Sequence, residues 1–281
     1  MITALKNYLQ RIQNIGDNPF WATQRSRAQR TGWLKTLWRG YAGFTLLIML
    51  PLGFVALNVI VHGCHWRPEL AGWLCAAGVL QLIYLGIKAS LATAPSVVQA
   101  RQQGTLLALA LTRINSADFA DGVALSESKN LLREFLVWTP ALALVTVISG
   151  QGLYSTLMLT LISILVVVYC AYNGVLISAT SKDSQEAGRR ASQGAFIGLA
   201  GSCLGFVCGG FMLGPLWILH PVFAYICSLY GAGTTYGMTM NQDLAPMFWC
   251  GWSLLVIPVY LWLVLNVRQL AIRALERVRI A

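Results

Sequence analysis

Apolar residues along the chain gather into runs of the length that a transmembrane helix needs, separated by shorter polar segments. About 20 apolar residues of α-helix cross the hydrocarbon core of a bilayer. Runs of this length predict six membrane-spanning helices, at about 42–62, 70–94, 131–149, 154–178, 194–212 and 247–267. A seventh apolar stretch, at about 213–235, is interrupted by Gly214-Pro215, Pro221 and the Gly231/Gly233 pair. Because interrupted backbone at membrane depth is tolerated only inside protein or beside water, this stretch is expected to be re-entrant.

The distribution of basic residues indicates how these segments are oriented. Of the 20 Lys and Arg, 18 fall in four segments, at 1–40, 95–133, 179–193 and 268–279. All four segments lie on one side of the membrane if the chain crosses six times, and the positive-inside rule makes that side cytoplasmic. A seventh crossing would place the last of these segments outside. We therefore expect six spans plus a re-entrant segment, with both termini cytoplasmic.

Composition places the chain among integral membrane proteins. It has 281 residues, of which 57% are hydrophobic and 11% charged, against about 25% charged in soluble domains. After a polar segment at 1–40, residues 41–281 are expected to form one all-α transmembrane domain, and the first apolar run begins too late for a cleaved signal peptide. The seven cysteines nearly all lie in apolar runs, which predicts core residues and not disulfides or metal ligands. No GxxxxGK[ST] loop occurs, so this chain is not expected to bind ATP in that way or to be an enzyme by itself.

The N-terminal segment has the pattern of an amphipathic helix that lies in the membrane interface. Asn18 can cap a helix and Pro19 suits its first position, and bulky aromatic residues then alternate with basic ones. Such a helix is held by tryptophan side chains and anionic lipid. The alternative is a basic topology anchor with no other role. The residues assigned to the interfacial helix are Asn18, Pro19, Trp21, Arg25, Trp33 and Trp38.

A short leucine-rich segment with polar ends, QARQQGTLLALALT at 99–112, follows the second expected span after Pro95. The two helical turns after Gly104 extend only about 10 Å, which is too short to cross a bilayer. The segment can continue the second span, float among lipid headgroups, or fill a hydrophobic groove on a partner protein. Thr105 can cap the leucine turns, while Arg101 and Arg113 can snorkel or pair with acidic groups of a partner.

The segment and its place in the chain resemble the membrane subunit of an ABC exporter of the type 2 class. In that family the stretch usually reads Glu-Arg-Glu-x-Gly-Thr-Leu-x-x-Leu-Leu-x-Thr-Pro-Leu-Ser. The residues that match here are Gly104, Thr105, Leu106, Leu109, Thr112 and Ser116. Gln102 and Gln103 stand where acids are usual, and Arg113 replaces the Pro. The family's Asn-Pro-Val-x-x-Arg-Glu start is matched by Asn18, Pro19 and Arg25, without its acid.

The resemblance implies that a coupling helix at about 99–115 docks into a cleft on a separate ATP-binding subunit. ATP and Mg would bind to that subunit, so this chain would need no cofactor. Because two acids of the pattern are glutamines, docking is expected to depend on leucine packing and glutamine hydrogen bonds. The residues that the resemblance assigns to ATPase coupling are Arg101, Gln102, Gln103, Gly104, Thr105, Leu106, Leu107, Leu109, Thr112 and Arg113.

The resemblance further implies a dimer with a second permease copy, identical or not, in the cytoplasmic (inner) membrane of a bacterium. Few intramembrane charges and short external loops favour a lipid, a lipid-linked product or a drug-like molecule as the exported substrate, and nucleic acid is not expected as a partner. Three other classes stay open. A secondary transporter would show repeated broken helices, an intramembrane enzyme would need paired catalytic groups at depth, and a scaffold or regulatory subunit would transport nothing.

Polar and small residues of the spans form two weaker groups of candidates. Lys88 lies deep in an apolar run and is expected to snorkel to the cytoplasmic interface, with a cavity-facing cation as the alternative. His62, Cys64 and His65 are potential metal ligands without a fourth partner, so no metal site is predicted. The residues assigned to a possible translocation path, with plain helix packing as the alternative, are Lys88, Gly209, Gly210, Pro215 and His220.

Overall fold

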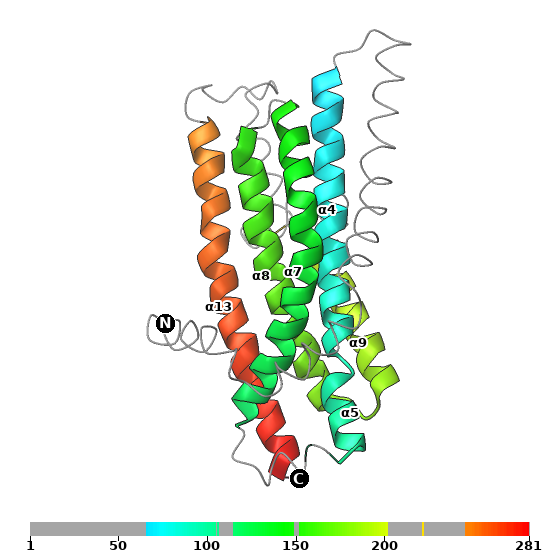
Figure 1. The fold of residues 1–281 in the computed structure, drawn as a ribbon. Helices are drawn as coiled ribbons and strands as arrows, with labels where there is room; N and C mark the ends of the chain where they lie inside the picture. The colour runs from blue at the N-terminus through cyan, green and yellow to red at the C-terminus, as the bar shows by residue number, and fades with distance from the viewer. Residues whose placement is uncertain are drawn as a thin grey trace.

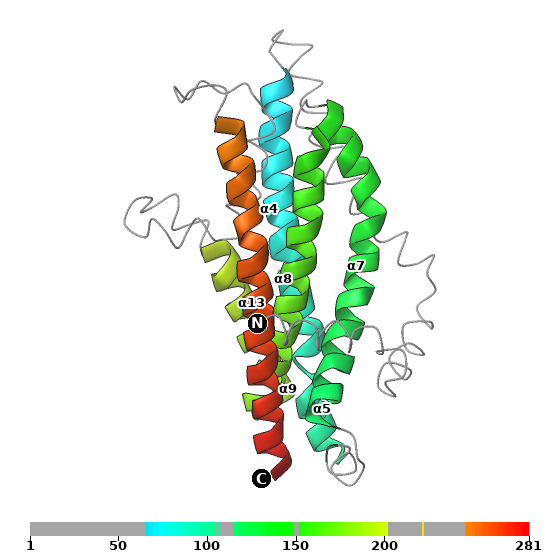
Figure 2. The same ribbon diagram turned by 90° about the vertical axis from the view of Figure 1, so that its left-hand side faces the viewer.

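Long helices lying side by side make up most of the computed structural model, which describes residues 66–104, 106, 115–148, 152–201, 221 and 245–280 (Figures 1 and 2). The secondary structure of this part of the chain is entirely helical. The long helices are α4 (Trp66–Thr93), α7 (Ser116–Ile148), α8 (Gly152–Thr180) and α13 (Ala245–Ile280). The short ones are α5 (Ser96–Gln102), α9 (Ser184–Phe196) and the π-helical turn η2 (Ile197–Gly201).

Three stretches of the described residues are long and apolar enough to cross a membrane: Ala77–Gln102, Leu153–Thr180 and Leu254–Val278. They coincide with the second, fourth and sixth of the expected spans. The chain is therefore an integral membrane protein of the helical class, as composition predicts.

The helix directions place the basic segments together. Helices α4, α8 and α13 run in one direction and α7 runs in the other, so the connections after α5 and α8 and the end of α13 share one end of the bundle (Figures 1 and 2). Basic residues from three of the four basic segments, among them Arg101, Lys182 and Arg277, belong to these connections and to the last turns of α13. We call this end of the bundle the basic end.

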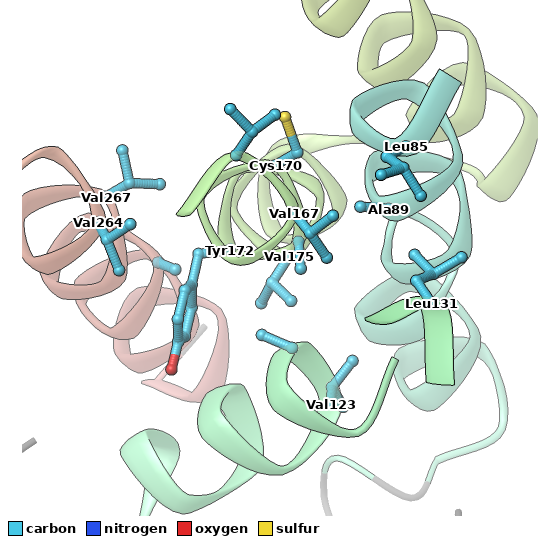
Figure 3. Close-up of a cluster of buried hydrophobic side chains, with 14 of the residues drawn as sticks. Leu85, Ala89, Val123, Leu131, Val167, Cys170, Tyr172, Val175, Val264 and Val267 are labelled. Atoms are coloured by element: carbon cyan, nitrogen blue, oxygen red, sulfur yellow. The ribbon is translucent and has the colours of Figure 1, made fainter. Parts of the chain in front are cut away.

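Helix α8 forms the centre of the bundle and packs against α4, α7 and α13. Its buried side chains meet residues of all three neighbours in one apolar cluster, and Figure 3 shows Val167, Cys170, Tyr172 and Val175 among them. Burial of Cys170 confirms that this cysteine is a core residue. Tyr169 and Tyr260 meet edge to face with ring centroids 6.2 Å apart, which adds an aromatic contact between α8 and α13.

Small residues let α4 and α8 approach closely. A Cβ atom added to Gly174 would lie 2.6 Å from the carbonyl oxygen of Ser90 and would overlap the Thr93 hydroxyl. Hydrogen bonds exploit the short separation, because Ser90 Oγ donates to the Cys170 carbonyl at 3.1 Å and Thr93 Oγ1 donates to the Ala171 carbonyl at 2.9 Å. The two helices are thus joined by backbone contact as well as by apolar packing.

Helix α7 begins fifteen residues before the third expected span, so the segment from Ser116 to the start of that span is helical as well. Asn115 begins the helix, because its carbonyl accepts from the amide of Asp118 at 3.0 Å and its side chain from that of Ala117 at 3.5 Å. Buried residues such as Phe119 and Val123 then hold the extension against the bundle. Tertiary packing therefore extends the helix beyond its apolar run.

The segment at 179–193, expected to be a polar loop, is mostly the helix α9. Asp183 caps it by accepting from the amide of Glu186 at 2.7 Å, and the Glu186 carboxylate accepts from the amide of Lys182 at 3.0 Å. This pair is a variant of the capping box, because Glu186 bonds to the amide of the residue before the cap and not to that of the cap itself. The buried face of α9 consists of Ala187, Ala191 and Ala195, which repeat every four residues. Alanines at helical spacing carry too little hydropathy to stand out among charged neighbours, which explains the error.

Several expectations concern residues outside the described part of the chain. These are the interfacial helix with Asn18, Pro19, Trp21, Arg25, Trp33 and Trp38, the first span at 42–62, and the group His62, Cys64 and His65. Most of the re-entrant segment at 213–235 and the candidates Gly209, Gly210, Pro215 and His220 also lie outside it.

Candidate functional site

The candidate site is a sharp turn at the basic end, directly after α5. Helix α5 continues the direction of α4 after a break at Ala94-Pro95 and ends at Gln102. Gly104 then adopts a φ of 69°, which a residue with a side chain rarely adopts. The glycine of the sequence motif therefore allows a sharp turn of the chain at this point. Of the three structures expected for the 99–115 segment, its first part is the continuation of the second span.

A residue from another helix fixes the start of α5. Pro95 precedes the first turn and offers no side-chain cap. Instead, the hydroxyl of Ser178 on α8 accepts from the amide of Val97 at 3.0 Å and from that of Val98 at 3.2 Å. Both valines are buried, so their amides have no access to water and need this acceptor.

Arg101 fixes the other end of α5. Its Nη2 donates to the carbonyl of Ser181 at 2.8 Å and to that of Lys182 at 2.9 Å, in the loop between α8 and α9. The guanidinium thereby joins the two connections at the basic end. Snorkelling and pairing with a partner's acids stay predictions for Arg101. Ala94 and Val98 pack on Ala187 and Ala191 of α9, which strengthens the same junction.

The turn presents polar groups to the outside. Arg101, Gln102, Gln103 and Gly104 are all exposed, and we call these four residues the corner. Beside the corner, α9 exposes Arg189, Arg190 and Gln193 on the face opposite its alanines. Arg190 pairs with Glu186 one turn earlier at 2.6 Å. The result is a polar surface with three exposed arginines, which is suited to binding a partner.

Leu106 differs from its expected role as a docking residue. It is helical and only partly exposed, and it packs against the apolar core of this chain. An aspartate at this position would therefore destabilise the bundle itself. Thr105, Leu107, Leu109, Thr112 and Arg113 lie outside the described residues.

Lys88, for which snorkelling to the cytoplasmic interface stays a prediction, pairs with an acid of another helix. Its ammonium lies 2.5 Å from Oε2 of Glu134 on α7, and it also sits 5.4 Å from the ring centroid of Tyr84. Glu134 lies near the start of the third expected span and was overlooked as a partner. An acid and a base that each interrupt an apolar run indicate such a pair, because charged side chains within a membrane-spanning segment are stabilised by pairing with one another.

A second charged contact was missed because its members lie far apart in the sequence. Asp121 of α7 meets Arg268 of α13, although 147 positions separate them. Arg268 had been assigned to the cytoplasmic tail for its charge alone. Searching the described residues for three or more His, Cys, Asp or Glu that could hold a metal ion finds no such group.

Comparison with known proteins does not identify the chain, since neither the models of known protein families nor the curated proteins include a match.

Proposed function

We propose that this chain is the permease subunit of an ATP-driven ABC exporter, and that the corner docks a separate ATP-binding subunit. The chain would cross the membrane six times, with a re-entrant segment before the last helix and both termini in the cytoplasm. It would work as a dimer of permease copies in a bacterial inner membrane. Its substrate would be hydrophobic or amphipathic, such as a lipid, a lipid-linked product or a drug-like molecule.

One observation carries the proposal: the Gly-Thr-Leu motif begins at a positive-φ glycine on a turn that is held rigidly and exposed. Ser178 fixes the start of α5, and Arg101 fixes its end to the next connection. A partner that pushes on Gln102 or Gln103 therefore moves α4, α8 and α9 together. A surface loop without such contacts would absorb the same displacement by bending.

The arrangement also favours docking over lipid contact. The exposed corner carries a cation and two amides, and the neighbouring face of α9 carries two more arginines. A helix that floats in the interface would need an apolar face toward lipid. Leu106, two residues beyond the corner, packs against the core of the chain.

Photo-crosslinking from the corner tests the proposal. A photoreactive residue at Gln103 should yield a covalent product with an ATP-binding protein when cell membranes are irradiated. The same residue in place of Leu157, which is exposed on the apolar face of α8, serves as the control and should react with lipid only. Products at Gln103 that contain only phospholipid or this chain would refute docking.

A charge change should show which residues bind. Gln102→Glu together with Gln103→Glu should alter the affinity for the ATP-binding subunit by about tenfold, while insertion into the membrane stays normal. Arg273→Glu on the exposed side of α13 introduces a comparable charge change and should leave that affinity unchanged. Copurification at a series of salt concentrations measures both, and equal affinities would contradict the assignment.

A non-transporting scaffold is the second candidate function. It accounts equally well for a rigid docking surface, but it predicts that nucleotide does not change the permease. Distances measured across the bundle with and without trapped nucleotide separate the two.

A further inference from the structure

Three charged or polar contacts hold α7 to its neighbours at different heights. Near the start of α7, Asp121 binds residues of α8 and α13. Further along, Glu134 binds Lys88 of α4. Near the end of the helix, Thr146 shares a hydrogen bond of 2.7 Å with Thr156 of α8. Asp121 and Glu134 are 13 residues apart, about 20 Å along the helix axis. Of the two ion pairs, the one with Asp121 is the more deeply buried.

The contact nearest to the start of α7 joins three helices through the carboxylate of Asp121. We call Asp121, Tyr172 and Arg268 the Asp121 cluster. Arg268 donates from Nε to Oδ1 at 2.7 Å and from Nη2 to Oδ2 at 2.6 Å. The Tyr172 hydroxyl donates to Oδ1 at 2.8 Å. Only 13% of the arginine side chain and 5% of the aspartate side chain are exposed. Figure 3 shows the Tyr172 ring lying between α13 and α7.

This geometry fixes the orientation of the helices more specifically than apolar packing does. A two-pronged arginine–carboxylate contact fixes both the distance and the orientation of its partners. The hydrophobic effect, by contrast, is non-directional. Breaking one partner of a buried ion pair leaves the other charge unpaired. Helices α7 and α13 are therefore expected to move as one unit at this level.

The position of the cluster in the chain gives that coupling a direction. Asp121 is the sixth residue of α7, and α7 is the first helix after the corner and the motif that follows it. The 99–115 segment leads into α7, so a displacement that it passes on would arrive at the first turn of this helix. The Asp121 cluster lies about one turn further and joins α7 to helices distant in the sequence through a buried carboxylate.

We infer that Asp121, Tyr172 and Arg268 are positioning residues that pass motion of the docked 99–115 segment on to α13 and α8. The inference rests on the proposed function, because it takes the ATP-binding subunit as the source of the motion. The sequence offers no reason to connect the tail helix with the coupling motif. In the structure, the carboxylate of Asp121 connects α7 with both α8 and α13.

Spin-label distances in the complete complex test the inference. Nitroxide labels carried by genetically encoded residues at Gln103 and Arg277 report on the corner and on the end of α13, each against a label at Leu153 on α8. All three positions are exposed, and this labelling leaves the seven native cysteines in place. Labelled chains are diluted with unlabelled ones. Trapping ATP with vanadate should shift both distances by about 2 Å or more in the unmodified protein.

Variants then separate the movement of the corner from its transmission to α13. In Asp121→Asn/Arg268→Gln, which removes both charges and leaves neither unpaired, the corner should still shift but the shift at Arg277 should be lost. Tyr172→Phe, which keeps the ion pair, should reduce that shift only partly. Arg273→Gln, one turn beyond Arg268 and exposed, is the matched control and should behave as the unmodified protein.

Two outcomes contradict the inference and differ from one another. If the double variant shifts at both positions as the unmodified protein does, the Asp121 cluster transmits nothing and the proposed function stands. If nucleotide shifts neither position in the unmodified protein, both the inference and the proposed function are wrong.

Discussion

Two glycines show how single residues of this chain matter for different physical reasons. Gly174 and Gly104 are both conspicuous glycines, yet they serve different purposes. Gly174 allows two helix backbones to touch, whereas nothing lies within 4 Å of the Cβ that Gly104 lacks, and its conformation is the reason for glycine. Both glycines can be read from the sequence. Only the structure shows that a substitution would cause steric overlap at Gly174 and an unfavourable backbone conformation at Gly104.

Gly174→Ala should destabilise the bundle, because the new methyl group would overlap the Thr93 hydroxyl and the Ser90 carbonyl on α4. Overpacking of this kind costs about 1–3 kcal/mol, and here one of the atoms belongs to the backbone. Gly194→Ala on α9 is the control, since no atom lies within 4 Å of its added Cβ. Thermal unfolding of the purified protein in detergent should show a lower midpoint for the first variant only. Equal midpoints would contradict the close contact.

Gly104→Ala should loosen the end of α5, because the left-handed conformation costs a residue with a Cβ about 1–2 kcal/mol. Asparagine tolerates this conformation better, so Gly104→Asn should have a smaller effect. Hydrogen exchange at the amides of Gln103 and Gly104, which bond to the carbonyls of Gln99 and Arg101, measures the change. Unchanged exchange in the alanine variant would show that the turn does not require the glycine.

At the scale of helices, the ends of α5 are stabilised by other parts of the chain. The proline that begins α5 predicts a helix start, but the acceptor for its first amides comes from Ser178, 80 or more residues later. Helix α9 is the opposite case, because Asp183 and Glu186 form its capping box within four residues. The capping box could have been recognised in the sequence, whereas the serine could not.

Ser178→Ala should weaken α5 and its attachment to α8, because the buried amides of Val97 and Val98 lose their common acceptor. Leaving buried donors unpaired costs about 1–3 kcal/mol. Thr180→Ala, two residues further, is a suitable control, since that hydroxyl is exposed and bonds to carbonyls of its own helix. The midpoint of thermal unfolding should fall for the serine variant and stay within a degree or two for the threonine variant.

At the scale of the whole molecule, the directions of the helices bring basic segments of the chain to the same end of the bundle. Three of the basic segments meet at one end of the described bundle, although nothing in the arrangement of the helices requires their charges to do so. The positive-inside rule predicts that this end faces the cytoplasm. The same end carries the corner, so the proposed docking surface would then face the compartment that contains ATP.

Reporter fusions after residue 281 test this orientation. A green fluorescent protein attached there should fluoresce, and alkaline phosphatase at the same position should be inactive, because the last turns of α13 belong to the basic end. Phosphatase fused within the connection between α7 and α8, at 149–151, is the control and should be active. The reverse pattern would place the corner outside and contradict the proposed function.

The sequence by itself determined the membrane class, the approximate position of three spans and the turn at Gly104, because these depend on the composition of continuous stretches and on one backbone conformation. Tertiary structure alone decided the partners of Lys88, Arg101, Asp121 and Arg268. A polar side chain in an apolar environment must find a partner, but the sequence does not show which distant helix supplies it. The extension of α7 and the alanine face of α9 were missed for a related reason, since weakly apolar segments become helical when the bundle gives them a surface to cover.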